Sequence, residues 1–372
     1  MEKINEKISS LEEYISIIKK YKLSNQYFRG ENQKYEGITS SLIRSYNPKE
    51  KNIGLIEIYT ELLNAYYQEV GYNLDKQQDE NFLAFSQHHG LKTNLIDFTT
   101  APLVALYFAC ERKEYNVDCG FVYVLKKDDT VDASKFLREY SIKEHLCCNV
   151  FEQLKNKKLD VIHEFTKLIT AYVVSSDRNP NNLIDAIIKQ IYEYPQLKRC
   201  NLYLKEKHEL DKEIVLMCQQ KNGLEKLEQG NKIQESLQLI RKYVQEIDEL
   251  GMVAVNEFVG LLILFLKDLS MTTELPPQLE FPSMPYFIYK TPLKFDRINN
   301  QNGVFLYQVF VDYGTDYEVV DGLMTQKIKP NIVIQIDNQK EIMKELDMVG
   351  INRKYIYGDF DSTAQYINMK FF

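Results

Sequence analysis

The stretch "QYFRGENQKYEGITSSLIR", residues 26–44, places an arginine after two aromatic residues and directly before a glycine. Aromatic residues at its start predict a short strand that ends at Gly30. A guanidinium group can donate two parallel hydrogen bonds to a phosphate or carboxylate, and glycine lets a ligand approach the backbone. The pattern therefore predicts that Arg29 binds an anionic ligand. The alternative is a structural ion pair between Arg29 and Asp97 or Glu31.

Helical spacing of apolar residues and strand-like alternation follow each other through the first third of the chain. The expected helices are residues 1–21 with an N-cap at Ser9 or Ser10, residues 52–70, residues 80–90 closed by Gly90, and the run that begins with Pro102. The expected extended segments are residues 26–30, 93–102 and 119–127. This mixture does not repeat a βαβ unit.

The middle of the chain has a different pattern, because residues 132–275 show long helical spacing and almost no strand signal. One apolar stripe, from Ile233 to Ile247, has the spacing of a core face or of a helix that pairs with another chain. Strand-like alternation returns after the proline-rich segment 272–285, and a helix, a short strand and a helix close the chain.

These patterns predict an α+β fold with a split mixed β-sheet core and flanking helices, interrupted by a large all-helical insertion. The predicted parts are residues 1–126 and 285–372, which form the core together, and residues 127–284, which form the insertion. We expect the first and last thirds to meet in space. An insertion of this kind often binds a partner, so a protein partner or self-association is expected there.

Composition excludes several protein classes. The chain has 372 residues, 44% of them hydrophobic, and a formal net charge of −7, so it can bury a core but has no overall basic field for nucleic acid. Its six cysteines lack zinc-ligand spacing. The apolar run at 252–266 is too short to cross a membrane, and the first residues lack the apolar core of a signal peptide. We expect a cytoplasmic protein with no membrane partner.

Four blocks of sequence carry a family resemblance. They are "YFRGE" at 27–31, "FSQHHGLKTNLIDFTTAPLVALYFA" at 85–109, "RINNQNGVFL" at 297–306 and "ELDMVGINRKYIYGDFDSTAQYI" at 345–367. Together and in this order they resemble the FRG-domain family of bacterial and phage proteins. The resemblance implies an intracellular effector of anti-phage defence or of the toxin type. Two residues depart from the family pattern: Asn94 stands where the family more often has arginine, and Phe98 where it has tryptophan.

A weaker similarity connects the same residues to ADP-ribosyltransferases. An aromatic-Arg-Gly strand, followed by a Thr-rich strand that runs into a helix, is similar to the layout in which those transferases bind NAD. The similarity implies that NAD is a substrate: the bond between nicotinamide and its ribose is broken, nicotinamide leaves, and ADP-ribose is transferred to water or to a macromolecule. The transferase pattern expects a glutamate on a late strand, whereas this chain offers Gln301.

Candidate site residues follow from this layout and from their chemistry. Arg29 would anchor the pyrophosphate, Thr99 and Thr100 would contact the ribose or a phosphate at a helix N-terminus, and a carboxylate would face the reacting ribose. The predicted catalytic residues are Arg29, Asp97, Gln301 and His89, with Glu31 as a further candidate for the acid. The predicted NAD-binding residues are Arg29, Gly30, Gln87, Thr99, Thr100 and Arg297, and no metal ligand is predicted.

Most of these residues also have a structural interpretation. His89 before Gly90 is typical of a helix C-terminus, and Gln87 of an amide that satisfies a buried backbone group. Asp359 and Asp361 in "GDFDS" favour a turn and a helix cap over a metal site.

Three functions are compatible with the sequence. The first is an NAD-dependent ADP-ribosyltransferase or NAD glycohydrolase. The second is a non-catalytic module that senses a nucleotide or a phage product through the same cleft. The third is a metal-dependent nuclease built around His88 or His89 and Asp97, which the acidic net charge disfavours.

Overall fold

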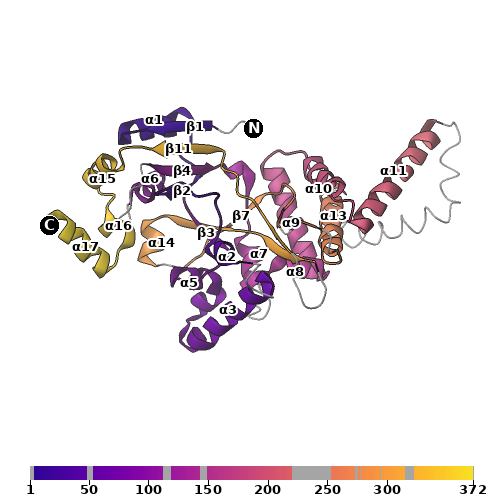
Figure 1. The fold of residues 1–372 in the computed structure, drawn as a ribbon, viewed down its shortest axis with the longest axis horizontal. Helices are drawn as coiled ribbons and strands as arrows, with labels where there is room; N and C mark the ends of the chain where they lie inside the picture. The colour runs from indigo at the N-terminus through magenta and orange to yellow at the C-terminus, as the bar shows by residue number, and fades with distance from the viewer. Residues whose placement is uncertain are drawn as a thin grey trace.

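The computed structural model describes residues 4–47, 53–111, 119–142, 149–219, 253–272, 275–276, 278–293, 295–314 and 322–371. These residues form the predicted α+β fold, with a central sheet, helices packed on it and a helical region at one end (Figure 1). The predicted apolar stripe at 233–247 lies outside the described residues.

Within the described ranges, eight strands form the main sheet in the order β1-β11-β4-β2-β3-β8-β7-β5. Their bounds are β1 Ile4–Ile8, β2 Tyr27–Glu31, β3 Leu95–Thr99, β4 Gly120–Leu125, β5 Thr130–Asp132, β7 Tyr286–Tyr289, β8 Gly303–Tyr307 and β11 Ile332–Ile336. The outer pairs β1·β11 and β5·β7 are parallel, and the inner pairs are antiparallel. Strands from the last third lie beside strands from the first third, as predicted.

The sheet is weakly joined at its centre. β2 pairs with β4 over five residue pairs and β3 pairs with β8 over five, but β2 and β3 share the single pair Phe28 and Thr99. Beyond that pair, the segment of β2 that carries Arg29 is not in register with β3. The expectation of a split mixed sheet is therefore confirmed at the strand that carries the arginine.

One face of the sheet is covered by helices. α1 Leu11–Lys20, α6 Pro102–Cys110 and α15 Gln339–Met348 pack on β1, β11, β4 and β2 through a shared apolar core. α3 Leu55–Val70 and α5 Phe82–His88 pack on the half that contains β3, β8 and β7. The opposite face carries a smaller apolar cluster with no helix in it, which includes Tyr27, Phe98 and Tyr123.

A helical region adjoins the far end of the sheet, at the right of Figure 1. It consists of α7 Ser134–Leu137, η3 Arg138–Ile142, α8 Val150–Lys155, α9 Leu159–Ser175, α10 Asn181–Glu193, α11 Lys198–Gln219 and α13 Val253–Leu269. A second sheet, β6 Gln278–Glu280, β10 Gly322–Thr325 and β9 Phe310–Tyr313, shares an apolar core with these helices. α13 contains most of the apolar run at 252–266 and is a buried helix, as expected.

Several predicted boundaries are confirmed by their capping residues. Ser10 caps α1 by accepting from the Glu13 N–H, Pro102 opens α6, and Gly90 follows α5 with a φ of 90°. The remaining elements are α2 Ser41–Ser45, η1 Gly71–Asn73, α4 Lys76–Glu80, η2 Lys127–Asp129, α14 Asp296–Asn300, α16 Arg353–Tyr357 and α17 Phe360–Phe371.

Two predictions about the chain ends were wrong. Residues 4–8 form strand β1, which pairs in parallel with β11, and the helix begins only at Leu11, after its N-cap Ser10. The expected strand near the C-terminus is the short helix α16. Asn352 caps α16 at its start, and Gly358 ends it with a φ of 74°, so local capping outweighs the β propensity of its aromatic residues.

Candidate functional site

Asp97 is the exposed residue of the otherwise buried strand β3. Strands at the centre of a covered sheet normally bury every side chain, so an exposed carboxylate there marks an opening in the covering layer. Gln87, from the end of α5, donates from Nε2 to Asp97 Oδ2 at 3.4 Å. The Thr93 hydroxyl donates to Gln87 Oε1 at 2.6 Å, which orients the amide toward the carboxylate. Gln87 and Asp97 are therefore brought together.

The end of α5 also reaches α14, through a histidine stacked on a phenylalanine. The rings of His88 and Phe295 are parallel within 2°, with centroids 4.0 Å apart. Burial, together with the neighbouring His89 and Arg297, lowers the pKa of His88 to about 4, so the ring is neutral near pH 7. α5 thus connects Asp97 on β3 with the start of α14, which carries Arg297.

His89, a predicted catalytic residue, is exposed and lies against the ring of Phe85, with centroids 4.4 Å apart. Its ring is edge-on to that of His88 at 5.0 Å. His88, which the sequence analysis assigned only to the nuclease alternative, is the histidine whose pKa is influenced by the charge of Asp97.

Thr99 and Gln301 join the first and last thirds of the chain. The buried Thr99 hydroxyl donates to the Gln301 carbonyl at 2.6 Å and accepts from the Ala101 N–H at 2.9 Å. The Gln301 side chain donates to the Ile356 carbonyl at 3.2 Å. Thr100, half-buried, donates from its backbone N–H to the Asn302 carbonyl at 3.2 Å. These bonds give the late glutamine and both threonines a structural role at the edge of the site.

Arg29 forms the ion pair that the structural alternative foresaw, with Glu31 as its partner. Nε lies 2.8 Å from Glu31 Oε1, and Nη1 donates to the backbone carbonyl of Asp97 at 2.9 Å. The second oxygen of Glu31 is buried without a hydrogen-bond partner among the described residues. Burial and the nearby Glu31 carboxylate raise the pKa of Tyr123 to about 12.

The Arg29 and Asp97 side chains extend to opposite faces of the sheet. Tyr27, two residues before Arg29, belongs to the cluster without helices, whereas Phe28 packs under α6. Phe98 belongs to the same cluster as Tyr27, so Asp97 next to it points to the helix-covered face. The guanidinium and the carboxylate therefore do not share one pocket, although Arg29 holds the backbone of the residue that carries the carboxylate.

Gly30 is explained by packing. A Cβ on Gly30 would lie 1.9 Å from the Ala105 carbonyl oxygen and 2.8 Å from the Ala109 nitrogen. α6 thus lies directly on the backbone of β2, which only glycine permits. The close approach that the sequence assigned to a ligand is made by a helix.

A cluster of charged and aromatic residues continues the site from α14 to α16. The guanidinium of Arg297 lies 5.4 Å from the Tyr357 ring centroid, and that of Arg353 lies 4.8 Å from it. Glu111 accepts from Arg353 Nη1 and from the Tyr357 hydroxyl, both at 2.6 Å. The sequence analysis predicted Arg297 and missed Arg353, Tyr357 and Glu111. The signal for two of them was the "NRKYIYG" part of the C-terminal block.

Asn94, which departs from the family pattern, is fully buried. Its amide accepts from the Tyr59 hydroxyl at 3.0 Å and donates to the Gln308 carbonyl at 3.0 Å. The position therefore serves packing between α3 and the segment after β8, and it offers no charge to Asp97.

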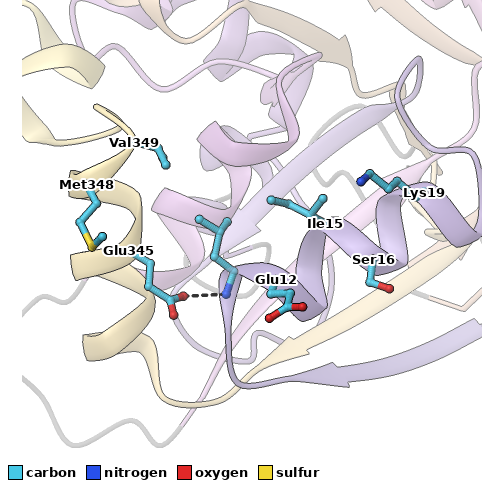
Figure 2. Close-up of a pocket in the computed structure, with 8 residues that line it drawn as sticks. Glu12, Ile15, Ser16, Lys19, Glu345, Met348 and Val349 are labelled. Atoms are coloured by element: carbon cyan, nitrogen blue, oxygen red, sulfur yellow. Dashed lines mark hydrogen bonds between the residues drawn. The ribbon is translucent and has the colours of Figure 1, made fainter.

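Other surface features lie apart from these residues. A groove between α1 and α15 is lined by Leu11, Ile15, Met348 and Val349, with the Leu11 N–H donating to Glu345 Oε2 at 2.7 Å (Figure 2). None of the candidate site residues lines it. In the part of the chain that the structure describes, no three His, Cys, Asp or Glu residues are grouped to hold a metal.

Asp359 accepts from the backbone and the hydroxyl of Ser362 at 2.6 and 2.9 Å, as a cap of α17. No helix of the described residues combines the length and apolar character that crossing a membrane requires.

Comparison with known proteins gives one match. The model of the FRG domain matches residues 24–117, which include β2, α5, β3 and α6. Arg29, Gln87, Asp97 and the threonines after it all lie within the matched range, whereas Arg297 and Gln301 lie outside it. No curated protein and no solved structure matches the chain.

Proposed function

Because this chain carries an FRG domain over residues 24–117, we propose that it is a defence-type effector that binds and cleaves NAD at the opening around Asp97. The observation that carries the proposal is the exposed Asp97 carboxylate on a buried central strand, next to Gln87, with the neutral His88 and the cationic Arg297 close by. Such clusters of titratable groups in an opening are typical of functional sites.

Cleavage of NAD needs little covalent help from a protein. The bond between C1′ of the ribose and the nicotinamide nitrogen breaks, and the pyridine leaves with the bonding electron pair as neutral nicotinamide. The ribose passes through a state with oxocarbenium character, which a carboxylate beside the ring stabilises. An acceptor hydroxyl then forms the new bond to C1′ and releases its proton. Asp97 supplies the carboxylate, and Gln87 orients it.

Arg29 acts from the other face as a positioning residue. Its bond to the Asp97 carbonyl fixes β3 where β2 and β3 share only one residue pair. A fixed backbone keeps the carboxylate aligned, which catalysis by electrostatic stabilisation requires. The acceptor is water in a glycohydrolase or a macromolecule in a transferase.

The test is the release of nicotinamide from NAD by the purified full chain. Asp97→Asn keeps the shape of the side chain but removes its charge, and we expect a loss of about 100-fold or more in rate. Asp128→Asn, which changes an exposed aspartate of η2, is the matched control. The proposal is wrong if wild type releases no nicotinamide, or if Asp97→Asn is as fast as wild type.

A sensor that binds NAD or a related nucleotide without cleaving it is the second candidate. It is favoured by Gln301, which this chain offers in place of the late-strand glutamate of a transferase; Gln301 ends α14 before β8, and its amide already donates to the Ile356 carbonyl. Saturable binding of NAD by wild type, with no nicotinamide released, would select this candidate.

A further inference from the structure

α14 and α16 meet in a tightly fitted contact. A Cβ on Gly358 would lie 2.9 Å from Asn300 Nδ2 and 3.0 Å from Asp296 Cβ, so the two helices nearly touch there. The Gln301 amide adds a hydrogen bond to the Ile356 carbonyl at 3.2 Å. Side chains that project from this contact are therefore held at fixed spacing.

Two guanidinium groups project beside one aromatic ring at this contact. Arg297 and Arg353 both lie within cation–π distance of Tyr357. Arg353 is neutralised by Glu111, with Nη1 and Oε1 separated by 2.6 Å. Arg297 is exposed and pairs with no carboxylate among the described residues.

The acidic residues nearest in the chain do not compensate Arg297. Both carboxylate oxygens of Asp359 already accept hydrogen bonds, from the backbone N–H and the hydroxyl of Ser362. Asp296 is exposed, and among the described residues its carboxylate forms no ion pair with Arg297. The unpaired guanidinium is thus a preorganised binding group for an anion, because the Tyr357 ring limits its rotamers and leaves its N–H groups available.

We propose that Arg297, Arg353 and Tyr357 form a phosphate-binding subsite that holds the pyrophosphate of the nucleotide whose reacting ribose lies at Asp97. This inference rests on the proposed function. The bond from Gln87 to Asp97 and the stack of the following residue, His88, on Phe295 link the carboxylate to the start of α14 through the end of α5. A pyrophosphate is attached to the same ribose through its 5′ carbon, so the anion subsite must adjoin the ribose subsite.

Binding of ADP, measured by calorimetry with the full chain, tests the subsite without requiring NAD cleavage. Loss of a charge-assisted hydrogen bond costs about 10-fold or more in affinity, so Arg297→Gln should lower the affinity for ADP by at least that factor. Adenosine, which has no phosphate, should bind wild type and Arg297→Gln equally. Lys354→Gln removes a neighbouring exposed charge on α16 and should leave ADP affinity within about 2-fold.

Three outcomes overturn the subsite: wild type binds ADP no more tightly than adenosine, Arg297→Gln binds ADP as wild type does, or Lys354→Gln is as harmful as Arg297→Gln. ADP binding that depends on Arg297, without nicotinamide release from NAD, would retain the subsite and reject the cleavage. Nicotinamide release, together with an ADP affinity that does not depend on Arg297, would retain the proposed cleavage and reject the subsite.

Discussion

Arg29 donates from Nη1 to the backbone carbonyl of Asp97 at 2.9 Å, although the two side chains extend to opposite faces of the sheet. The bond is made where β2 and β3 have ceased to pair, so the guanidinium takes the place of a missing ladder hydrogen bond. The arginine of the family motif thereby supports the strand that presents the carboxylate.

The ion pair of Arg29 with Glu31 should be important for stability, because only 17% and 4% of the two side chains are exposed. Arg29→Gln leaves the Glu31 carboxylate buried without its cation, and we expect a loss of about 3 kcal/mol in the free energy of unfolding. The double variant Arg29→Gln/Glu31→Gln should lose less than the single one. Urea denaturation measures both, and a double variant less stable than Arg29→Gln would refute the pairing.

Gly30→Ala should be strongly destabilising, because its Cβ would meet the backbone of α6 at 1.9 Å. Backbone atoms cannot move aside as a flexible side chain can, so we expect a cost of about 3 kcal/mol or more. Gly37→Ala is the matched control, since a Cβ there meets nothing within 4 Å. The melting temperatures of the two variants test this, and a Gly30→Ala variant that melts at the same temperature as Gly37→Ala would show that close packing against α6 does not require glycine.

Asp312 on β9 should make stability depend on pH. Its Oδ2 accepts from the Ile56 N–H at 2.8 Å, and burial raises its pKa from 3.8 to about 6. Since the folded state favours the protonated form, the stabilisation is complete below about pH 4 and is lost as the pH rises through 6. Asp312→Asn keeps an acceptor without the charge and should raise the free energy of unfolding at pH 8.

The gain from Asp312→Asn should vanish near pH 4, whereas Asp128→Asn should be neutral at both values. Denaturant titrations at pH 4 and pH 8 provide the comparison. A variant less stable than wild type at pH 8 would mean that the charged carboxylate is favourable at that position.

His88 should titrate far below an ordinary histidine, with a midpoint near pH 4, because it is partly buried against Phe295 and lies near the charges of His89 and Arg297. The folded state favours the neutral ring, so this stabilisation is complete above pH 6.5 and is lost as the pH falls toward 4. Phe295→Ala should uncover the ring and move its midpoint up. NMR titration of the histidine ring protons checks both values, and a wild-type midpoint near 6.5 would contradict the packing.

Local signals predicted most of the elements around the site. Ser10, Gly90 and Pro102 end or begin helices as their chemistry requires, and the aromatic run before Gly30 is a strand. The strand at residues 4–8 was missed because "INEKI" has isoleucines spaced for a helix, while its partner β11 lies in the last third of the chain. A partner so distant in sequence leaves no local trace.

The spatial arrangement of the candidate site residues could not be predicted from the sequence. Gln87 and Asp97 are joined by a hydrogen bond, but sequence spacing could not show that Arg29 points to the other face. That depends on where β2 and β3 stop pairing, and on α6 occupying the space above Gly30. Arg353 and Tyr357 were missed because their partners, Arg297 and Glu111, lie about 60 and 240 residues earlier in the chain, and spacing within one block does not show such contacts.

A crystal structure of the full chain soaked with NAD tests the central claim most directly. We predict density for a ribose within hydrogen-bond distance of the Asp97 carboxylate, with the phosphates at Arg297. Density on the opposite face, at Arg29 and Glu31, or a saturated soak that leaves the Asp97 opening without ligand, would contradict it.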